Sequence, residues 1–125
     1  SVIYFTAAGL FDILAENTFG KRQNKDSDVF EHIYDCDLLI IDDLGTELPN
    51  SFTVSQLFIC LNERILRQKS TIISTNLALD DIKTIYSERT FSRISSNYTI
   101  LRITGDDIRI QKKLLNLGGT NDVTP

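Results

Sequence analysis

Residues 38–43 constrain the fold of this chain more than any other stretch, because four apolar residues run directly into two carboxylates. A short, continuous apolar run is typical of a buried parallel strand. Asp42 and Asp43 follow the run, and a turn signal at Gly45 follows them. Ligands of open α/β sheets bind at the carboxyl ends of the strands. The run therefore predicts a buried strand with both carboxylates at the edge where a ligand would bind.

The two adjacent carboxylates suit the active site of a nucleotide triphosphatase. In such a site one carboxylate holds Mg²⁺, directly or through water, and another orients or deprotonates the attacking water. Side chains alternate along a strand, so we expect Asp42 and Asp43 to point to opposite sides and to have different roles. A strand that merely ends in an acidic turn, capped by Asp43, explains the same two residues and stays open as the simpler interpretation.

The rest of the chain alternates between short β-rich stretches and amphipathic stretches with helical spacing. The pattern predicts further strands at residues 2–6, 70–74 and 98–103, and helices at residues 8–17, 27–34, 50–65, 82–85 and 87–96. Strands that alternate with helices are typical of an α/β fold in which crossover helices connect the strands of a parallel sheet.

The composition limits the classes of protein that this chain can represent. Its 125 residues, 42% of them hydrophobic, are enough for one domain with a buried core. No apolar run approaches the roughly 18 residues of a membrane span, and no signal-peptide pattern is present, so we expect a cytoplasmic protein. The net charge of -4 gives no general affinity for nucleic acid. Cys36, Cys60 and the single His32 fit no metal-binding spacing, and we expect the cysteines to be buried thiols.

A second strand end supports the nucleotide interpretation. The predicted strand at 70–74 is followed by Thr75 and Asn76. A neutral amide at the tip of a neighbouring strand can hydrogen-bond a γ-phosphate or the attacking water without adding negative charge. A simple turn residue is the alternative for Asn76, but its pairing with the carboxylates favours a functional role.

Four segments, in this order, resemble successive motifs of AAA+ ATPases. They are Leu-Leu-Ile-Ile-Asp-Asp-Leu-Gly-Thr-Glu at 38–47, Ile-Ile-Ser-Thr-Asn at 72–76, Ser-Glu-Arg-Thr-Phe-Ser-Arg-Ile at 87–94 and Gly-Asp-Asp-Ile-Arg at 105–109. More narrowly, they resemble the helicase-loader group typified by DnaC and DnaI, with the transposition ATPase IstB close by. The resemblance implies an AAA+ P-loop NTPase-type parallel sheet with crossover helices, and ATP and Mg²⁺ as cofactors.

The resemblance also implies roles for individual residues. Asp42 would be the Walker B carboxylate that serves Mg²⁺, and Asp43 the acid that polarises water, although glutamate is usual at that position. Asn76 would be the sensor-1 residue, and Arg109 would contact the phosphates as sensor 2. Arg93 would be the arginine finger that reaches the γ-phosphate of a neighbouring protomer.

Two of these assignments leave an alternative open. Arg89, four residues before Arg93, is a second candidate for the finger, and one of the two arginines would then make only a structural ion pair. Arg109 is nearly as well explained as a solvated surface arginine.

The glycine-rich phosphate loop that this group needs is absent from the sequence, which contains no Gly-x-x-x-x-Gly-Lys-Ser/Thr. We therefore expect residues 1–117 to form a partial ATPase core, incomplete at the N-terminus because the first strand and the phosphate loop are missing. Residues 118–125 are expected to be a flexible tail, with no C-terminal lid domain. A degenerate relative that no longer binds ATP is the alternative. ATP hydrolysis is expected of the complete protein and not of this chain alone.

The resemblance implies partners as well. They are a replicative DnaB-type helicase, single-stranded DNA and further copies of the same chain, with no membrane. Phe19, Lys21, Arg22 and Lys25 combine an aromatic ring with three cations, as a single-stranded DNA site requires. A solvated polar loop explains the same residues. A transposition ATPase and a non-catalytic adaptor that binds DNA or helicase remain alternative functions.

Overall fold

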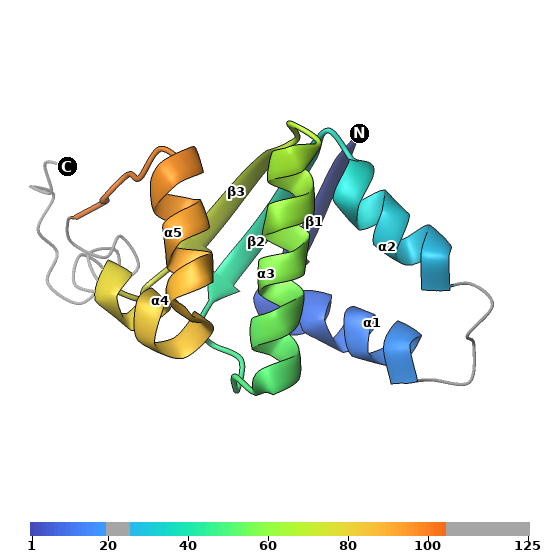
Figure 1. The fold of residues 1–125 in the computed structure, drawn as a ribbon, viewed down its shortest axis with the longest axis horizontal. Coiled ribbons are helices and arrows are strands. Elements are labelled where there is room, and N and C mark those ends of the chain that lie inside the picture. Colours follow the sequence, from blue (N-terminus) through green and yellow to red (C-terminus); the bar gives the residue numbers. More distant parts are fainter. Residues whose placement is uncertain (20–25, 105–125) are drawn as a thin grey trace, which may run out of the picture.

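The computed structural model describes residues 1–19 and 26–104, in which strands and helices alternate (Figure 1). The elements are β1 (Val2–Thr6), α1 (Ala7–Phe19), α2 (Asp26–Asp35), β2 (Leu38–Leu44), α3 (Ser51–Leu66), β3 (Ser70–Thr75), α4 (Leu79–Tyr86) and α5 (Glu88–Asn97). The predicted alternation is confirmed over this range. None of the helices described has the length and apolar character that crossing a membrane requires.

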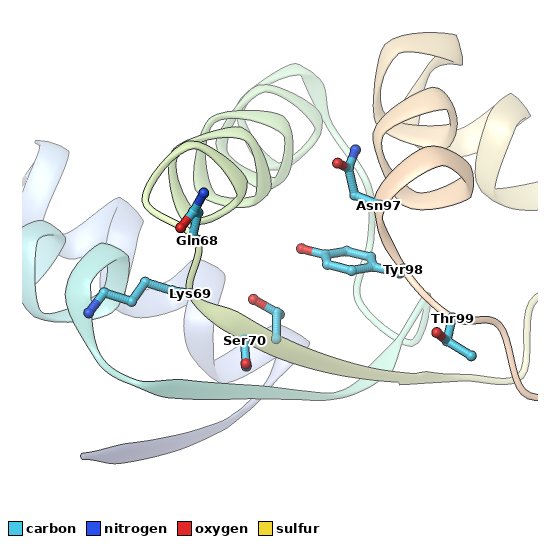
Figure 2. A pocket seen from close by; sticks show the side chains of 7 residues that line it. Gln68, Lys69, Ser70, Asn97, Tyr98 and Thr99 are labelled. Atoms are coloured by element: carbon cyan, nitrogen blue, oxygen red, sulfur yellow. The ribbon is translucent and has the colours of Figure 1, made fainter.

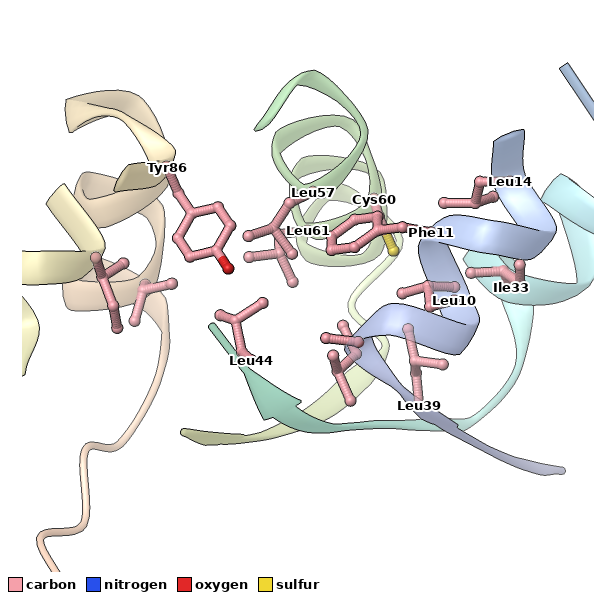
Figure 3. Close-up of a cluster of buried hydrophobic side chains, with 14 of the residues drawn as sticks. Leu10, Phe11, Leu14, Ile33, Leu39, Leu44, Leu57, Cys60, Leu61 and Tyr86 are labelled. Carbon is pink, nitrogen blue, oxygen red and sulfur yellow. The ribbon is translucent and has the colours of Figure 1, made fainter. Parts of the chain in front are cut away.

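The strands form one parallel three-stranded sheet in the order β1-β2-β3. In the register of the sheet, Thr6 of β1 lies beside Asp42 of β2, and Ile41 of β2 lies beside Ile73 of β3. Because the strands follow one another in sequence order and crossovers are right-handed, the connecting helices must cover the same face. Figures 2 and 3 show the helices on one side of the strands. The expected fold class, a parallel sheet with crossover helices, is confirmed.

The hydrophobic core lies between this sheet face and the helices (Figure 3). Leu39 and Ile41 of β2 point into it and are completely buried. Ile40, between them, belongs to the opposite face, where its neighbours Tyr4 and Ile72 are 57% and 53% exposed. The apolar run of β2 is therefore fully buried on one face only, and Leu38 is half-buried on the other.

A buried arginine of α3 connects this helix to the end of α2 and the start of β3. Arg64 of α3 is fully buried. Its guanidinium donates hydrogen bonds to the backbone oxygens of Ile33 (2.8 Å) and Ser70 (2.6 Å), and its Nε donates to Oγ1 of Thr71 (2.9 Å). Each of these bonds satisfies a polar group that burial would otherwise leave without water. The contacts fix the start of β3 against the end of α2.

The strand predicted at residues 98–103 is wrong: the structure has no regular secondary structure there. Within the part of the chain that the structure describes, β3 pairs only with β2, so this segment has no neighbouring strand to pair with. Leu101 and Ile103 are 79% and 92% exposed. A cavity of about 380 Å³ lies between the start of β3 and the segment after α5, and Tyr98 lines it (Figure 2).

Candidate nucleotide site

Asp42 lies at the carboxyl end of β2, and hydroxyl groups from both neighbouring strands hold its carboxylate. The Tyr4 hydroxyl of β1 donates to Oδ2 at 2.5 Å, and the Ser74 hydroxyl of β3 donates to Oδ1. The Ser74 hydrogen bond, followed by that of Tyr4, lowers the pKa of Asp42. The hydrogen bond between Tyr4 and Asp42 also raises the pKa of the Tyr4 hydroxyl. The carboxylate is therefore ionised and fixed in orientation at the sheet edge.

At Asp43 the regular strand geometry stops. Its φ of 57° is left-handed, and the pairing of β2 with β3 is irregular between Ile41 and Leu44. Aspartate adopts this conformation more readily than most residues because its short side chain can hydrogen-bond locally. The backbone N–H of Asp43 donates to Oγ of Ser74 at 2.9 Å, and its side chain is exposed. The left-handed backbone is a physical reason for an aspartate rather than a glutamate at this position.

The turn after the two carboxylates is tied to α4. Gly45 has a φ of 103°, and a Cβ atom there would lie 2.6 Å from Cδ1 of Leu77. Glu47 accepts a hydrogen bond from the Gly45 backbone N–H at 2.9 Å and another from the buried Tyr86 hydroxyl at the end of α4. Burial, together with the bond to Glu47, raises the pKa of Tyr86. Glu47 thus links the turn after Asp43 to the end of α4.

Asn76 follows β3 at the same edge of the sheet as Asp42. Leu44 pairs with Thr75, which places the ends of both strands side by side. The Asn76 side chain is exposed. The residues that contact Asp42 are Ser74 and Tyr4, which sequence reasoning missed. The period of two along each predicted strand was the available signal, because it places Ser74 and Asn76 on one face.

The donors around Asp42 suit a Mg²⁺ ion. They are carboxylate and hydroxyl oxygens, the hard ligands that Mg²⁺ prefers. Among the described residues, no cluster of three or more His, Cys, Asp or Glu side chains forms a complete metal site. Mg²⁺ is usually bound by one or two carboxylates together with substrate phosphates. Cys36 and Cys60 are free and buried, as expected.

The two candidate finger arginines lie on α5 and contact α3, not the carboxylates. Arg93 is half-buried, and its Nε donates to Oδ1 of Asn62 at 3.0 Å. Arg89 is exposed, and its guanidinium carbon lies 4.3 Å from the centre of the Phe58 ring. Arg109 lies outside the described residues.

The predicted DNA-binding residues are only partly described. Phe19, at the end of α1, is 73% exposed, and its ring centre lies 5.1 Å from that of Phe52 on α3. Lys21, Arg22 and Lys25 lie outside the described residues, as do residues 118–125 of the predicted tail.

Comparisons with known proteins agree with this fold. No curated protein matches the chain. The chain is similar to a solved structure described as "Crystal structure of the DnaC helicase loader", with a TM-score of 0.71 and 24% identity, covering 81% of this chain and 60% of that one. That likeness shows the shared fold. The sequence pattern of the family described as IstB-like ATP binding protein matches residues 1–116. This chain therefore belongs to the IstB-like ATP binding protein family.

Proposed function

We propose that this chain is part of the ATPase domain of a protein that loads a replicative helicase onto single-stranded DNA. One observation carries the proposal: the Asp42 carboxylate is fixed by Tyr4 and Ser74 at the carboxyl edge of a parallel sheet, directly before Asp43. A merely acidic turn does not need hydroxyl groups from two neighbouring strands to orient its carboxylate. A Mg²⁺ site does, because ligand orientation depends on such supporting hydrogen bonds.

In this proposal each residue of the site has a distinct task. Asp42 holds Mg²⁺, which when bound neutralises charge on the phosphates. Asp43 orients the attacking water and accepts its proton, and the amide of Asn76 hydrogen-bonds the γ-phosphate or that water. Arg93 contacts the γ-phosphate held by a second copy of the chain, and Arg109 contacts the phosphates of its own copy.

A phosphate-binding loop is also required, and the strand that would carry it fits at the edge of β3 that no described strand covers. Among the described strands, β3 pairs only with β2, and the cavity beside Ser70 lies between this strand and Tyr98. A strand paired with β3 would satisfy its free backbone groups and give residues 98–103 a neighbour. We therefore place ATP binding in the full-length protein and not in these residues alone.

Helicase loading is supported by the likeness in fold to a protein described as a helicase loader. Single-stranded DNA binding is supported by the exposed Phe19 ring beside Phe52, because bases stack on such rings. Lys21, Arg22 and Lys25 would attract the phosphate backbone. A transposition ATPase is the second candidate, because the matching family is named for IstB.

Substitution of Asp42 in the full-length protein tests the proposal. We expect Asp42→Ala and the isosteric Asp42→Asn to abolish Mg²⁺-dependent ATP hydrolysis while the circular dichroism spectrum and thermal midpoint stay close to those of the wild type. Asp12→Asn, an exposed carboxylate on α1, is the matched control and should hydrolyse ATP normally. Unchanged turnover in both Asp42 variants would remove the central claim.

Loading assays separate the candidate functions. A helicase loader should bind a purified replicative helicase and place it on circular single-stranded DNA in an ATP-dependent manner. ATP hydrolysis without any helicase binding favours the transposition ATPase. Normal loading by Asp42→Ala favours the non-catalytic adaptor.

A further inference from the structure

The two arginines of α5 face the same aromatic ring on α3. The guanidinium carbon of Arg89 lies 4.3 Å from the centre of the Phe58 ring, and that of Arg93 lies 5.7 Å from it. The Nε of Arg93 also donates to Oδ1 of Asn62 at 3.0 Å. Residues four positions apart share one face of a helix. Phe58 and Asn62, four residues apart on α3, therefore contact two arginines that are four residues apart on α5.

Both partners of these arginines are neutral, unlike those of other surface cations. Arg67 pairs with Glu31 at 3.0 Å, and Lys83 lies 3.4 Å from Glu88. Within the described part of the chain, no carboxylate lies within 4.0 Å of Arg89 or Arg93. An aromatic face and an amide oxygen orient a guanidinium without neutralising it. Among the described residues, nothing neutralises either positive charge, so both suit an anion.

The contact with Asn62 uses only the Nε of Arg93 and, within residues 1–19 and 26–104, leaves Nη1 and Nη2 without an acceptor. Asn62 accepts from Nε, and no described residue accepts a hydrogen bond from Nη1 or Nη2 of Arg93. A guanidinium is a rigid planar fork, so fixing one N–H group also sets the direction of the others. Two parallel N–H groups at that end match the geometry of a phosphate.

The helix that carries the arginines is itself held in place. Thr90 and Ile94 of α5 are buried at 0% and 7% exposure, and Ser87 caps the first turn by accepting from the Thr90 backbone N–H at 3.4 Å. The helix axis is therefore fixed against the core, and only the long arginine side chains need a further support. Phe58, half-buried on α3, provides it.

We infer that Phe58 and Asn62 are positioning residues that hold Arg93, with Arg89 beside it, in the orientation in which Arg93 reaches a phosphate on a second copy of this chain. This inference rests on the proposed function. A cation that is oriented before the reaction stabilises the transition state without a further ordering cost. Loss of either support should then affect turnover much more than ATP binding.

Steady-state hydrolysis by the full-length protein tests this inference. We expect Phe58→Leu and Asn62→Ala to lower kcat by about 10- to 100-fold and to change KM for ATP by less than about twofold. Phe58→Tyr keeps the ring and should retain activity. Phe91→Leu is the matched control, because its ring faces Lys83 at 5.9 Å and neither arginine. Wild-type kcat in both Phe58→Leu and Asn62→Ala, with Arg93→Ala inactive, would overturn the inference and leave the proposed function standing.

Mixed assemblies separate positioning from a loss of structure. Asp43→Asn subunits should not hydrolyse ATP but should still present intact arginines to a neighbour. In a mixed assembly, an Asp43→Asn subunit can supply its arginines to the intact ATP site of a neighbouring Phe58→Leu subunit. Mixing should therefore restore hydrolysis at that site, and the same is expected when Arg93→Ala subunits replace the Phe58→Leu subunits. No recovery on mixing would overturn the inference, because the defect would then lie within the same subunit. Full activity of Arg93→Ala alone would overturn the finger assignment itself.

Discussion

Ser74 connects the two carboxylates of the candidate site, because its hydroxyl donates to Asp42 and accepts from the backbone N–H of Asp43 at 2.9 Å. One side chain thus fixes both the Asp42 carboxylate and the left-handed backbone of its neighbour. Asn76, two residues further along, is the residue that the sequence pattern emphasises, but Ser74 makes the contacts. Its substitution is therefore a sensitive probe of the site.

We expect Ser74→Ala to raise the pKa of Asp42 toward the ordinary carboxyl value, because the Ser74 hydrogen bond is the largest contribution to lowering it. Tyr4→Phe should raise the pKa less. Carboxyl titration by NMR measures both effects. In the full-length protein, Ser74→Ala should also lower ATP turnover by about 10- to 100-fold, as is typical when a residue supporting a metal ligand is lost.

Ser70→Ala is the matched control for this prediction, since Ser70 lies at the other end of β3 and its side chain is likewise exposed. It should change neither the pKa of Asp42 nor the turnover. Equal behaviour of Ser70→Ala and Ser74→Ala would show that Ser74 has no special relation to the carboxylate.

Gly45→Ala should destabilise the fold. The glycine has a left-handed φ of 103°, and an added Cβ would lie 2.6 Å from Leu77. We expect a loss of about 1–3 kcal/mol in the free energy of unfolding, measured by urea denaturation. Leu77→Ala in the same chain removes the steric clash but not the backbone strain. In a double-mutant cycle it should recover only part of the loss, and simple additivity of the two substitutions would contradict the steric account.

Local sequence patterns were sufficient for most of the fold. The apolar run that precedes Asp42 predicts β2, because a short, continuous apolar run is by itself the signal of a strand at the centre of a sheet. Asn50 predicts the start of α3, and its side chain accepts from the Thr53 backbone N–H at 2.9 Å, as a helix cap does. Such features depend on residues that are close in sequence.

Features that depend on distant partners could not be predicted in this way. The contact of Tyr4 with Asp42 depends on the register of β1 against β2, which the two segments do not specify separately. The alternating pattern at residues 98–103 is compatible with a strand, but a strand also needs a neighbour. Arg93 was expected to be an arginine finger, with a structural ion pair as the alternative for one of the two arginines, and only the packing of α5 on α3 shows that its Nε donates to the neutral Asn62.

The stability of the fold should decrease at alkaline pH because of buried acids that must stay neutral. Burial raises the pKa of Cys60 from about 9 to about 12, and that of Tyr34 from about 10 to about 12. In the unfolded chain these groups lose their protons at lower pH than in the folded one. Their contribution is therefore complete below the unfolded pKa and is lost as pH rises toward 12. Urea denaturation at pH 7 and pH 10 should show this decrease. A Cys60→Ala variant should show a smaller one, and an equal decrease would contradict the role of the thiol.

Arg64 offers the clearest test of the packing at the end of the sheet opposite the candidate site. Truncation by Arg64→Ala removes the donors to the buried backbone oxygen of Ile33 and the part-buried one of Ser70, and opens a cavity. We expect the free energy of unfolding to fall by about 3–5 kcal/mol in urea denaturation. Arg64→Lys keeps the charge but not the planar fork, and should recover only part of the loss. Arg67→Ala, three residues later, removes ion pairs with exposed carboxylates such as Glu31 and the contact with the Tyr34 ring, and should cost about 1 kcal/mol or less. If the Arg64 and Arg67 variants lost the same stability, the buried hydrogen bonds would not be what joins α2, α3 and β3.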